Sequence, residues 1–153
     1  MTHIDHVTVI VADADATARL LGKLLGAEVQ HIADSPALVV RTLDIAGVEI
    51  HLVDFRDDIH NESRKVALGL HHVALRVPDL VTAVERFHAA GVRGRGEPVE
   101  TAPGVWEIFV DAEAAGGVPL QLVERRATAE GAVFDASAVA RLAAQASLSS
   151  TVE

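Results

Sequence analysis

One pattern occurs twice in the chain, and this internal repeat constrains the fold more than any other feature. Residues 3–13 (HIDHVTVIVAD) align with residues 69–79 (GLHHVALRVPD) at an offset of 66, which places His6 on His72. A second pair of segments, residues 47–54 and 117–124, ends the two copies. The sequence therefore predicts one module used twice, with a side chain able to bind metal at the start and at the end of each copy.

Composition limits the classes of function. The 153 residues suffice for one ordinary domain or two small packed modules, and half of them are hydrophobic, so we expect a folded globular protein. A net charge of −9 argues against nucleic-acid binding, which needs a basic face. The absence of cysteine excludes disulfides and thiolate ligands, so metal chemistry would have to use imidazole and oxygen ligands.

The N-terminus and the apolar stretches bear on localisation. Met1 leads directly into an alternating strand pattern without a basic start, a signal-length apolar run or a cleavage site. No apolar stretch approaches the length that crosses a bilayer. We expect a soluble cytoplasmic protein.

Periodicity and turn residues predict a strand, a helix and further strands in each copy. Asp13 or Asp15 can cap the first helix, Gly26 can end it, and a turn is expected at Ala46–Gly47. The expected elements are strand Ile4–Val11, helix Ala14–Leu25, strands Ala37–Leu43, Val48–Phe55 and Leu70–Val77, helix Leu80–Ala90, strands Val105–Asp111 and Val118–Arg125, and helix Val133–Leu148.

These elements divide the chain into four segments. We expect a first module over residues 1–55, a polar linker over 56–68 and a second module over 69–126. An alanine-rich helical tail over 127–153 follows, and the sequence does not decide whether it packs on the body or on a partner subunit.

Strand alternation places several polar side chains on equivalent faces. In the first strand His6, Thr8 and Ile10 share one face, and the all-valine face should contact the helix. The same rule places Glu49 and His51 on one face of their strand. On the less apolar faces of four equivalent strands stand His6, His51, His72 and Gln121.

If the copies pair, these four side chains can converge on one ion. Three imidazoles and one amide oxygen suit a single divalent cation, namely Zn, Ni, Co, Fe or Mn, and leave positions for water or substrate. Such a cation would polarise a carbonyl and stabilise an enolate. The competing interpretation is that each histidine has a structural or surface role. His71 is expected to point away from His72 by alternation.

Three motifs resemble the vicinal oxygen chelate superfamily of glyoxalase I and its relatives, and within it most of all the methylmalonyl-CoA epimerases. They are residues 4–7 (IDHV), 69–74 (GLHHVA) and 115–124 (AGGVPLQLVE), and the resemblance spans about residues 4–125. It implies an α+β fold in which two paired βαβββ modules form a half-open barrel around one divalent metal. It also implies substrates that chelate the metal through neighbouring oxygens.

Carried onto this chain, the metal-ligand positions of the family fall on His6, His51, His72 and Gln121. The chain departs from the family pattern at two of them, since the last is typically glutamate and that at His51 is more usually Gln or Glu. Glu124 is a weaker substitute than Gln121, because alternation puts it on the opposite face.

An amide at position 121 cannot act as a base near neutral pH, so a proton-moving mechanism needs its base elsewhere. Glu49 is the leading candidate because it shares the face of His51, although a solvated carboxylate is an equally good interpretation. Glu107 is a weaker candidate, since the face it occupies is undetermined. Arg76 could pair with a substrate carboxylate or phosphate, and Thr8 is a second substrate-binding candidate.

The resulting hypothesis is a metal-dependent enzyme that acts on a small carbonyl substrate through a metal-stabilised enolate, in the manner of an acyl-CoA epimerase or other isomerase. One alternative keeps the metal and changes the reaction to that of a dioxygenase or lyase. Another is a non-catalytic binding protein of the drug-resistance type, which the amide at Gln121 favours and the aligned histidines disfavour. We expect a homodimer that binds neither nucleic acid nor membrane.

Overall fold

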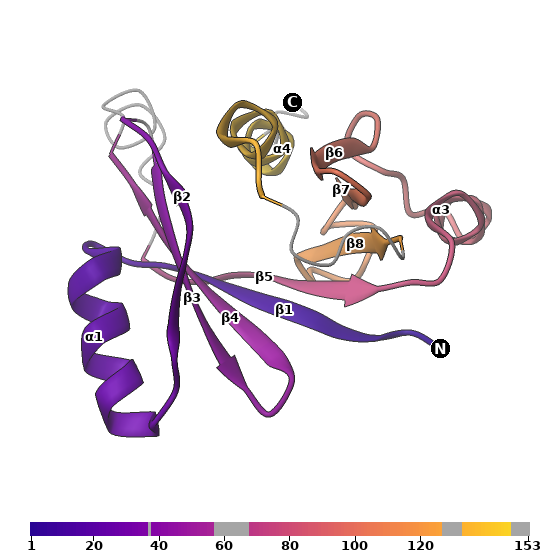
Figure 1. Ribbon diagram of the computed structural model, residues 1–153. Coiled ribbons are helices and arrows are strands. Elements are labelled where there is room, and N and C mark those ends of the chain that lie inside the picture. Colours follow the sequence, from indigo (N-terminus) through magenta and orange to yellow (C-terminus); the bar gives the residue numbers. More distant parts are fainter. Residues whose placement is uncertain (37, 57–67, 127–132, 148–153) are drawn as a thin grey trace. The chain divides into compact units, whose positions relative to one another are not determined.

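A computed structural model describes residues 1–36, 38–56, 68–126 and 133–147 (Figure 1). They form two compact units. The first, Asp5–His72, is called the histidine unit below, and the second, Met1–Ile4 with the chain from Val73 onward, is called the C-terminal unit. The expected linker over 56–68 lies outside the described residues except at its two ends.

The histidine unit contains a helix and a mixed sheet whose strand order is β2-β3-β4-β1. β1 and β4 are parallel, whereas β2 with β3 and β3 with β4 are antiparallel. α1 lies along one side of this sheet (Figure 1). The elements are β1 (His3–Ile10), α1 (Ala14–Leu25), β2 (Val29–Asp34), β3 (Leu38–Ile45) and β4 (Val48–Phe55).

The C-terminal unit repeats this topology in the strand order β5-β8-β7-β6, with β5 and β8 parallel. The predicted α+β fold class with two βαβββ modules is therefore confirmed. The elements are β5 (Gly69–Arg76), α3 (Leu80–Ala89), β6 (Val99–Ala102), β7 (Val105–Phe109), β8 (Leu120–Arg125) and α4 (Ala136–Ser147).

The sequence pattern does not locate two strands, β2 and β6, although the resemblance to the superfamily implies three strands after each helix. Each is the edge strand at one end of its sheet, and each contains an irregularity in register, between His31 and Ala33 in β2 and between Glu100 and Ala102 in β6. A bulged edge strand has neither strict alternation nor an apolar run, so it lacks the usual sequence signals of a strand.

The ends of the two module helices follow the repeat. Asp13 accepts a hydrogen bond from the backbone N–H of Ala16 at 2.9 Å, and Asp79 accepts one from that of Thr82 at 2.7 Å. These carboxylates satisfy amides that have no partner within a helix's first turn. Gly26 ends α1 at a φ of 65°, as predicted.

Both units bury one sheet face against the module helix. In the histidine unit Ala18 of α1 packs with Leu43 and Leu52, and Val9 and Val11 join this cluster, as the all-valine face predicts. In the C-terminal unit the corresponding cluster contains Leu80, Ile108 and Leu122 and includes residues of α3. These contacts hold the opposite face of each sheet in place.

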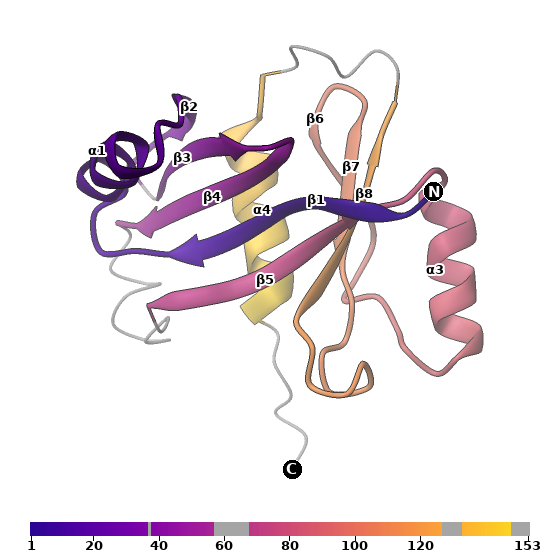
Figure 2. The same cartoon turned by 90° about the horizontal axis from the view of Figure 1, so that it is seen from below.

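The described part of the tail packs on the body of its own chain. α4 contacts β6 and β7, and α3 and α4 lie on opposite sides of the strands of this unit (Figures 1 and 2). Helix α4 begins at Ala136 because Asp135 accepts hydrogen bonds from the backbone N–H groups of Ser137 and Ala138. None of the described helices is both long and apolar enough to cross a membrane.

Candidate active site

Three histidines predicted from the repeat gather in the histidine unit, although they come from three strands. His6 on β1, His51 on β4 and His72 on β5 are 3%, 8% and 6% exposed. The rings of His6 and His51 are stacked, with centroids 4.0 Å apart and planes within 2°. The ring of His72 stands edge-on to that of His6, with a centroid separation of 5.6 Å.

Each of these rings is also held by a residue close to it in sequence. Nδ1 of His6 lies 2.8 Å from Oδ1 of Asp5, and Nε2 of His51 lies 2.8 Å from Oε2 of Glu49. Nδ1 of His72 lies 2.7 Å from Nδ1 of His71. An imidazole that binds a metal usually donates its other N–H to such a partner.

The ring of His71 makes a contact that alternation does not indicate. Its ring contacts that of His72 at a centroid distance of 5.0 Å, even though adjacent strand residues point to opposite faces. Nδ1 is close to the backbone, so two neighbouring rings that turn toward each other can still bond. Burial lowers the pKa of His71, which favours its neutral form.

Glu49 and Thr8 occupy positions beside the histidines in the parallel pair of β1 and β4. Glu49 is the register partner of His6, and Thr8 is that of His51. Thr8 is 4% exposed, whereas the side chain of Glu49 is 35% exposed. The candidate base therefore borders the histidine group and also reaches solvent.

The other predicted site residues belong to the C-terminal unit. Gln121 is 2% exposed, and its Oε1 accepts no hydrogen bond within the part of the chain that the structure describes. Arg76 is half-buried on β5. Glu124 accepts hydrogen bonds from the backbone N–H of Leu80 and from Arg126, so it is bound at the start of α3.

The register of β7 and β8 also fixes the face of Glu107, which the sequence left open. Glu107 faces Val123 and Phe109 faces Gln121, so Glu107 and Gln121 are diagonal neighbours on one face. Glu107 is 4% exposed and accepts a hydrogen bond from the hydroxyl of Thr101. This unit thus contains a buried carboxylate that sequence reasoning ranked low.

The histidine group fits a divalent cation by its donor chemistry. Neutral imidazole is a common ligand of Zn, Ni, Co and Fe, and the carboxylate acceptors beside His6 and His51 favour the required tautomers. However, among residues 1–36, 38–56, 68–126 and 133–147 no group of three His, Cys, Asp or Glu side chains is arranged to hold an ion. The lone pairs of stacked rings lie in parallel planes, so binding would require His6 or His51 to turn.

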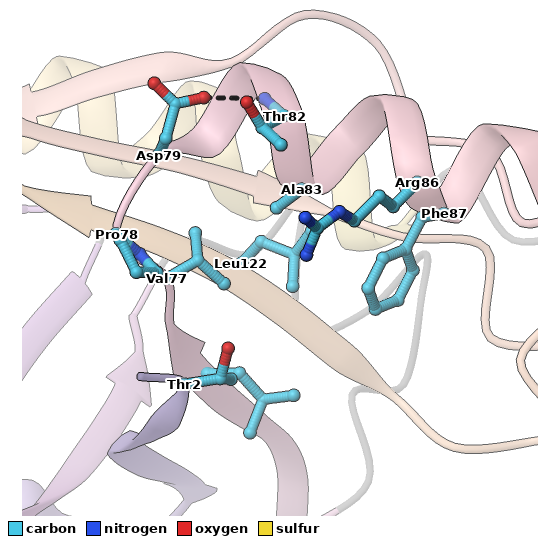
Figure 3. Close-up of a pocket in the computed structure, with 10 residues that line it drawn as sticks. Thr2, Val77, Pro78, Asp79, Thr82, Ala83, Arg86, Phe87 and Leu122 are labelled. Atoms are coloured by element: carbon cyan, nitrogen blue, oxygen red, sulfur yellow. Dashed lines mark hydrogen bonds between the residues drawn. The ribbon is translucent and has the colours of Figure 1, made fainter.

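A separate pocket of about 260 Å³ lies in the C-terminal unit, against the sheet face that α3 covers (Figure 3). Its walls are mainly apolar and include Val77, Phe87 and Leu122, with Arg86 at one side. None of the residues predicted to carry chemistry lines it. We therefore place the candidate active site at the histidines.

Comparison with known proteins agrees with the fold and the motifs. Residues 3–122 match the model of the Glyoxalase/Bleomycin resistance protein/Dioxygenase superfamily. The chain belongs to this superfamily. The ethylmalonyl-CoA/methylmalonyl-CoA epimerase of Cereibacter sphaeroides is 31% identical over 127 residues, which cover 78% of this chain and 95% of that relative.

Solved structures of two epimerases have the same fold. Methylmalonyl-CoA epimerase from Mycobacterium tuberculosis is 26% identical, with a TM-score of 0.71 over 84% of this chain and 91% of the other. A single-substitution variant of the Streptomyces coelicolor enzyme, in complex with 2-nitronate-propionyl-CoA, is 22% identical, with a TM-score of 0.69 over 83% of this chain and 96% of the other. The predicted resemblance to the superfamily and its epimerases is thus confirmed.

Proposed function

We propose that this protein is a divalent-metal-dependent isomerase that moves a proton on the carbon beside a carbonyl group, with methylmalonyl-CoA as the first candidate substrate. The observation that carries the proposal is the group of three buried histidines, at positions where the resemblance to the superfamily implies metal ligands. The epimerase relatives support the reaction and the substrate class.

His6, His51 and His72 are the proposed metal ligands, and Gln121 is the proposed fourth. The buried Oε1 of Gln121, which has no hydrogen bond to the described residues, supports this role for the amide. Co, Ni, Zn, Mn and Fe all suit a set of three imidazoles and one amide oxygen. When bound, such an ion supplies Lewis-acid polarisation of a substrate carbonyl.

Glu49 is the proposed base. It takes the proton from the substrate C–H bond at a carboxylate oxygen, while the electron pair of that bond moves toward the carbonyl oxygen. The hydrogen bond with Nε2 of His51 holds the carboxylate, and its partial exposure allows a substrate to reach it. A proton held there exchanges with solvent, which provides a measurable signature.

Two further residues are proposed to bind the substrate. Thr8 is a buried hydroxyl beside His51 and can donate a hydrogen bond to a substrate oxygen. Arg76 can pair with a carboxylate or phosphate of the substrate, because a guanidinium matches the geometry of either group.

The test combines metal analysis of the isolated protein with exchange of the substrate's acidic hydrogen in deuterated water. We expect one equivalent of metal per chain and exchange of methylmalonyl-CoA by the parent. Glu49→Gln should abolish exchange while leaving metal affinity nearly intact, and Glu85→Gln on the exposed side of α3 is the matched control. Exchange of the substrate hydrogen by Glu49→Gln at the parent rate would show that Glu49 is not the base.

The same measurements separate the alternatives. Metal binding without exchange, together with tight retention of a small molecule, would indicate a binding protein of the resistance type. Iron that reacts with oxygen only in the presence of substrate would indicate a dioxygenase, and anaerobic metal analysis would identify that iron.

We also propose a homodimer. Leu20, Leu24 and Leu25 of α1 are 57%, 69% and 56% exposed, and the first two lie one helical turn apart. Exposed leucines at this spacing form an apolar stripe that a second copy could cover. Sedimentation that shows only monomer at high concentration would contradict this proposal.

A further inference from the structure

We infer that Asp5 and His71 are positioning residues, which fix the ring nitrogen that His6 and His72 present to an ion. This inference rests on the proposed function for the identity of the ligand. The hydrogen bonds that carry it belong to the metal-free protein and can be measured without an ion.

The pairing of Asp5 with His6 determines the tautomer of the ring. The side chain of Asp5 is 5% exposed, and its Oδ1 lies 2.8 Å from Nδ1 of His6. An ionised carboxylate only accepts hydrogen bonds, so Nδ1 must carry the proton. In a neutral ring Nε2 then keeps its lone pair, and Nε2 is the nitrogen that would bind an ion.

The contact between His71 and His72 is a second orienting bond of different chemistry. The two Nδ1 atoms are 2.7 Å apart, so one of them donates and the other accepts. We assign the donor to His72, because a ring that binds an ion through Nε2 must carry its proton on Nδ1. His71 then accepts with Nδ1 and carries its own proton on Nε2.

The ring of His51 is held by its other nitrogen. His51 donates from Nε2 to Glu49 and would present Nδ1. The metal-free protein should therefore contain His6 and His72 as Nδ1–H tautomers and His51 as the Nε2–H tautomer. A purely structural role for Asp5 and His71 does not require these tautomers, since His72 could equally be the acceptor of its hydrogen bond with His71.

The experiment uses the full chain, labelled with ¹⁵N and stripped of metal, and records the ring nitrogens by NMR before Zn²⁺ is titrated. Asp5→Ala should shift His6 away from the Nδ1–H tautomer and weaken Zn²⁺ binding by about 10- to 100-fold. His71→Ala should do the same to His72. Asp5→Asn, which keeps an acceptor oxygen, should restore most of the tautomer and part of the affinity, and it guards against misfolding of the alanine variant.

His88→Ala is the matched control, because His88 is exposed on α3 in the C-terminal unit and should change neither measurement. Nε2–H signals for His6 and His72 in the parent would overturn the inference, as would unchanged Zn²⁺ affinity in folded Asp5→Ala and His71→Ala. The predicted tautomers in a parent that binds no Zn²⁺ would instead overturn the proposed metal site and leave the orienting bonds supported.

Discussion

The two βαβββ modules have the same strands and differ in the sheet face that lies away from the module helix. In the histidine unit this face carries His6, Thr8 and His51, all buried. In the C-terminal unit the matching face carries different buried polar side chains, Glu107 and Gln121, and its apolar residues Ala74, Val105 and Val123 pack with Phe134 of the tail. The two modules thus share a scaffold, whereas the chemistry depends on which polar side chains each face carries.

The faces that contact the module helices are alike, and this likeness allows a matched test. Leu52 on β4 and Leu122 on β8 occupy equivalent positions, and they are 1% and 0% exposed. Leu52→Ala and Leu122→Ala should each lower the free energy of unfolding by about 2–5 kcal/mol, because each leaves a cavity in a close-packed cluster. Denaturant unfolding measures both.

The exposed Leu68 is the control for this pair, and Leu68→Ala should change stability by no more than about 0.5 kcal/mol. A loss below about 1 kcal/mol at only one of the two buried positions would show that the cores are not equivalent. The two modules would then differ in stability at the helix-facing cluster, where their residues correspond most closely.

Sequence reasoning predicted the parts of the fold that have regular patterns. Alternation placed Val9 and Val11 against α1 and Thr8 on the histidine face, and the structure agrees. It did not locate β2 and β6, because bulged edge strands lack that pattern. The packing of α4 on β6 and β7 could not be read from an alanine-rich stripe, which fits many apolar surfaces.

The candidate site was partly predictable for the same reason. The repeat identified His6 and His72, and alternation added Glu49 and His51 to one strand face. Alternation gave no sign of the bond between His71 and His72, because it describes the direction of Cβ and not the turn of a ring. Asp5 carried a usable signal, namely a carboxylate next to a predicted ligand.

The second prediction concerns Gln121, a buried polar residue on the face of the C-terminal unit that lies away from the module helix. Gln121→Glu should tighten binding of a divalent metal by about 10-fold, since a carboxylate adds charge where the amide has none. Titration of metal into the stripped protein measures the change. Gln30→Glu, on exposed β2, adds the same charge elsewhere and should have little effect. Equal affinities for the parent and Gln121→Glu would remove Gln121 from the proposed ligands.

The smallest effect is expected from substituting the aspartates that cap α1 and α3. Asp13→Ala and Asp79→Ala should each lower the midpoint of thermal unfolding slightly, because each leaves one amide of the first helical turn without its acceptor. Asp79→Asn should lose less than Asp79→Ala, since an amide oxygen still accepts this bond. Thermal unfolding at neutral pH checks all three variants.

At acidic pH the difference in unfolding midpoint between the parent and Asp79→Ala should disappear. The hydrogen bond from the backbone of Thr82 lowers the pKa of Asp79 below its usual value of 3.8. A folded-state pKa that is lowered means that the ionised cap stabilises the fold above the ordinary range of the carboxyl group, and that this contribution is lost as the pH falls through the folded-state pKa. The parent and Asp79→Ala should therefore differ in unfolding midpoint at pH 7 and converge in acid. A difference that persists below the folded-state pKa would show that Asp79 stabilises α3 by packing and not by accepting this hydrogen bond as a carboxylate.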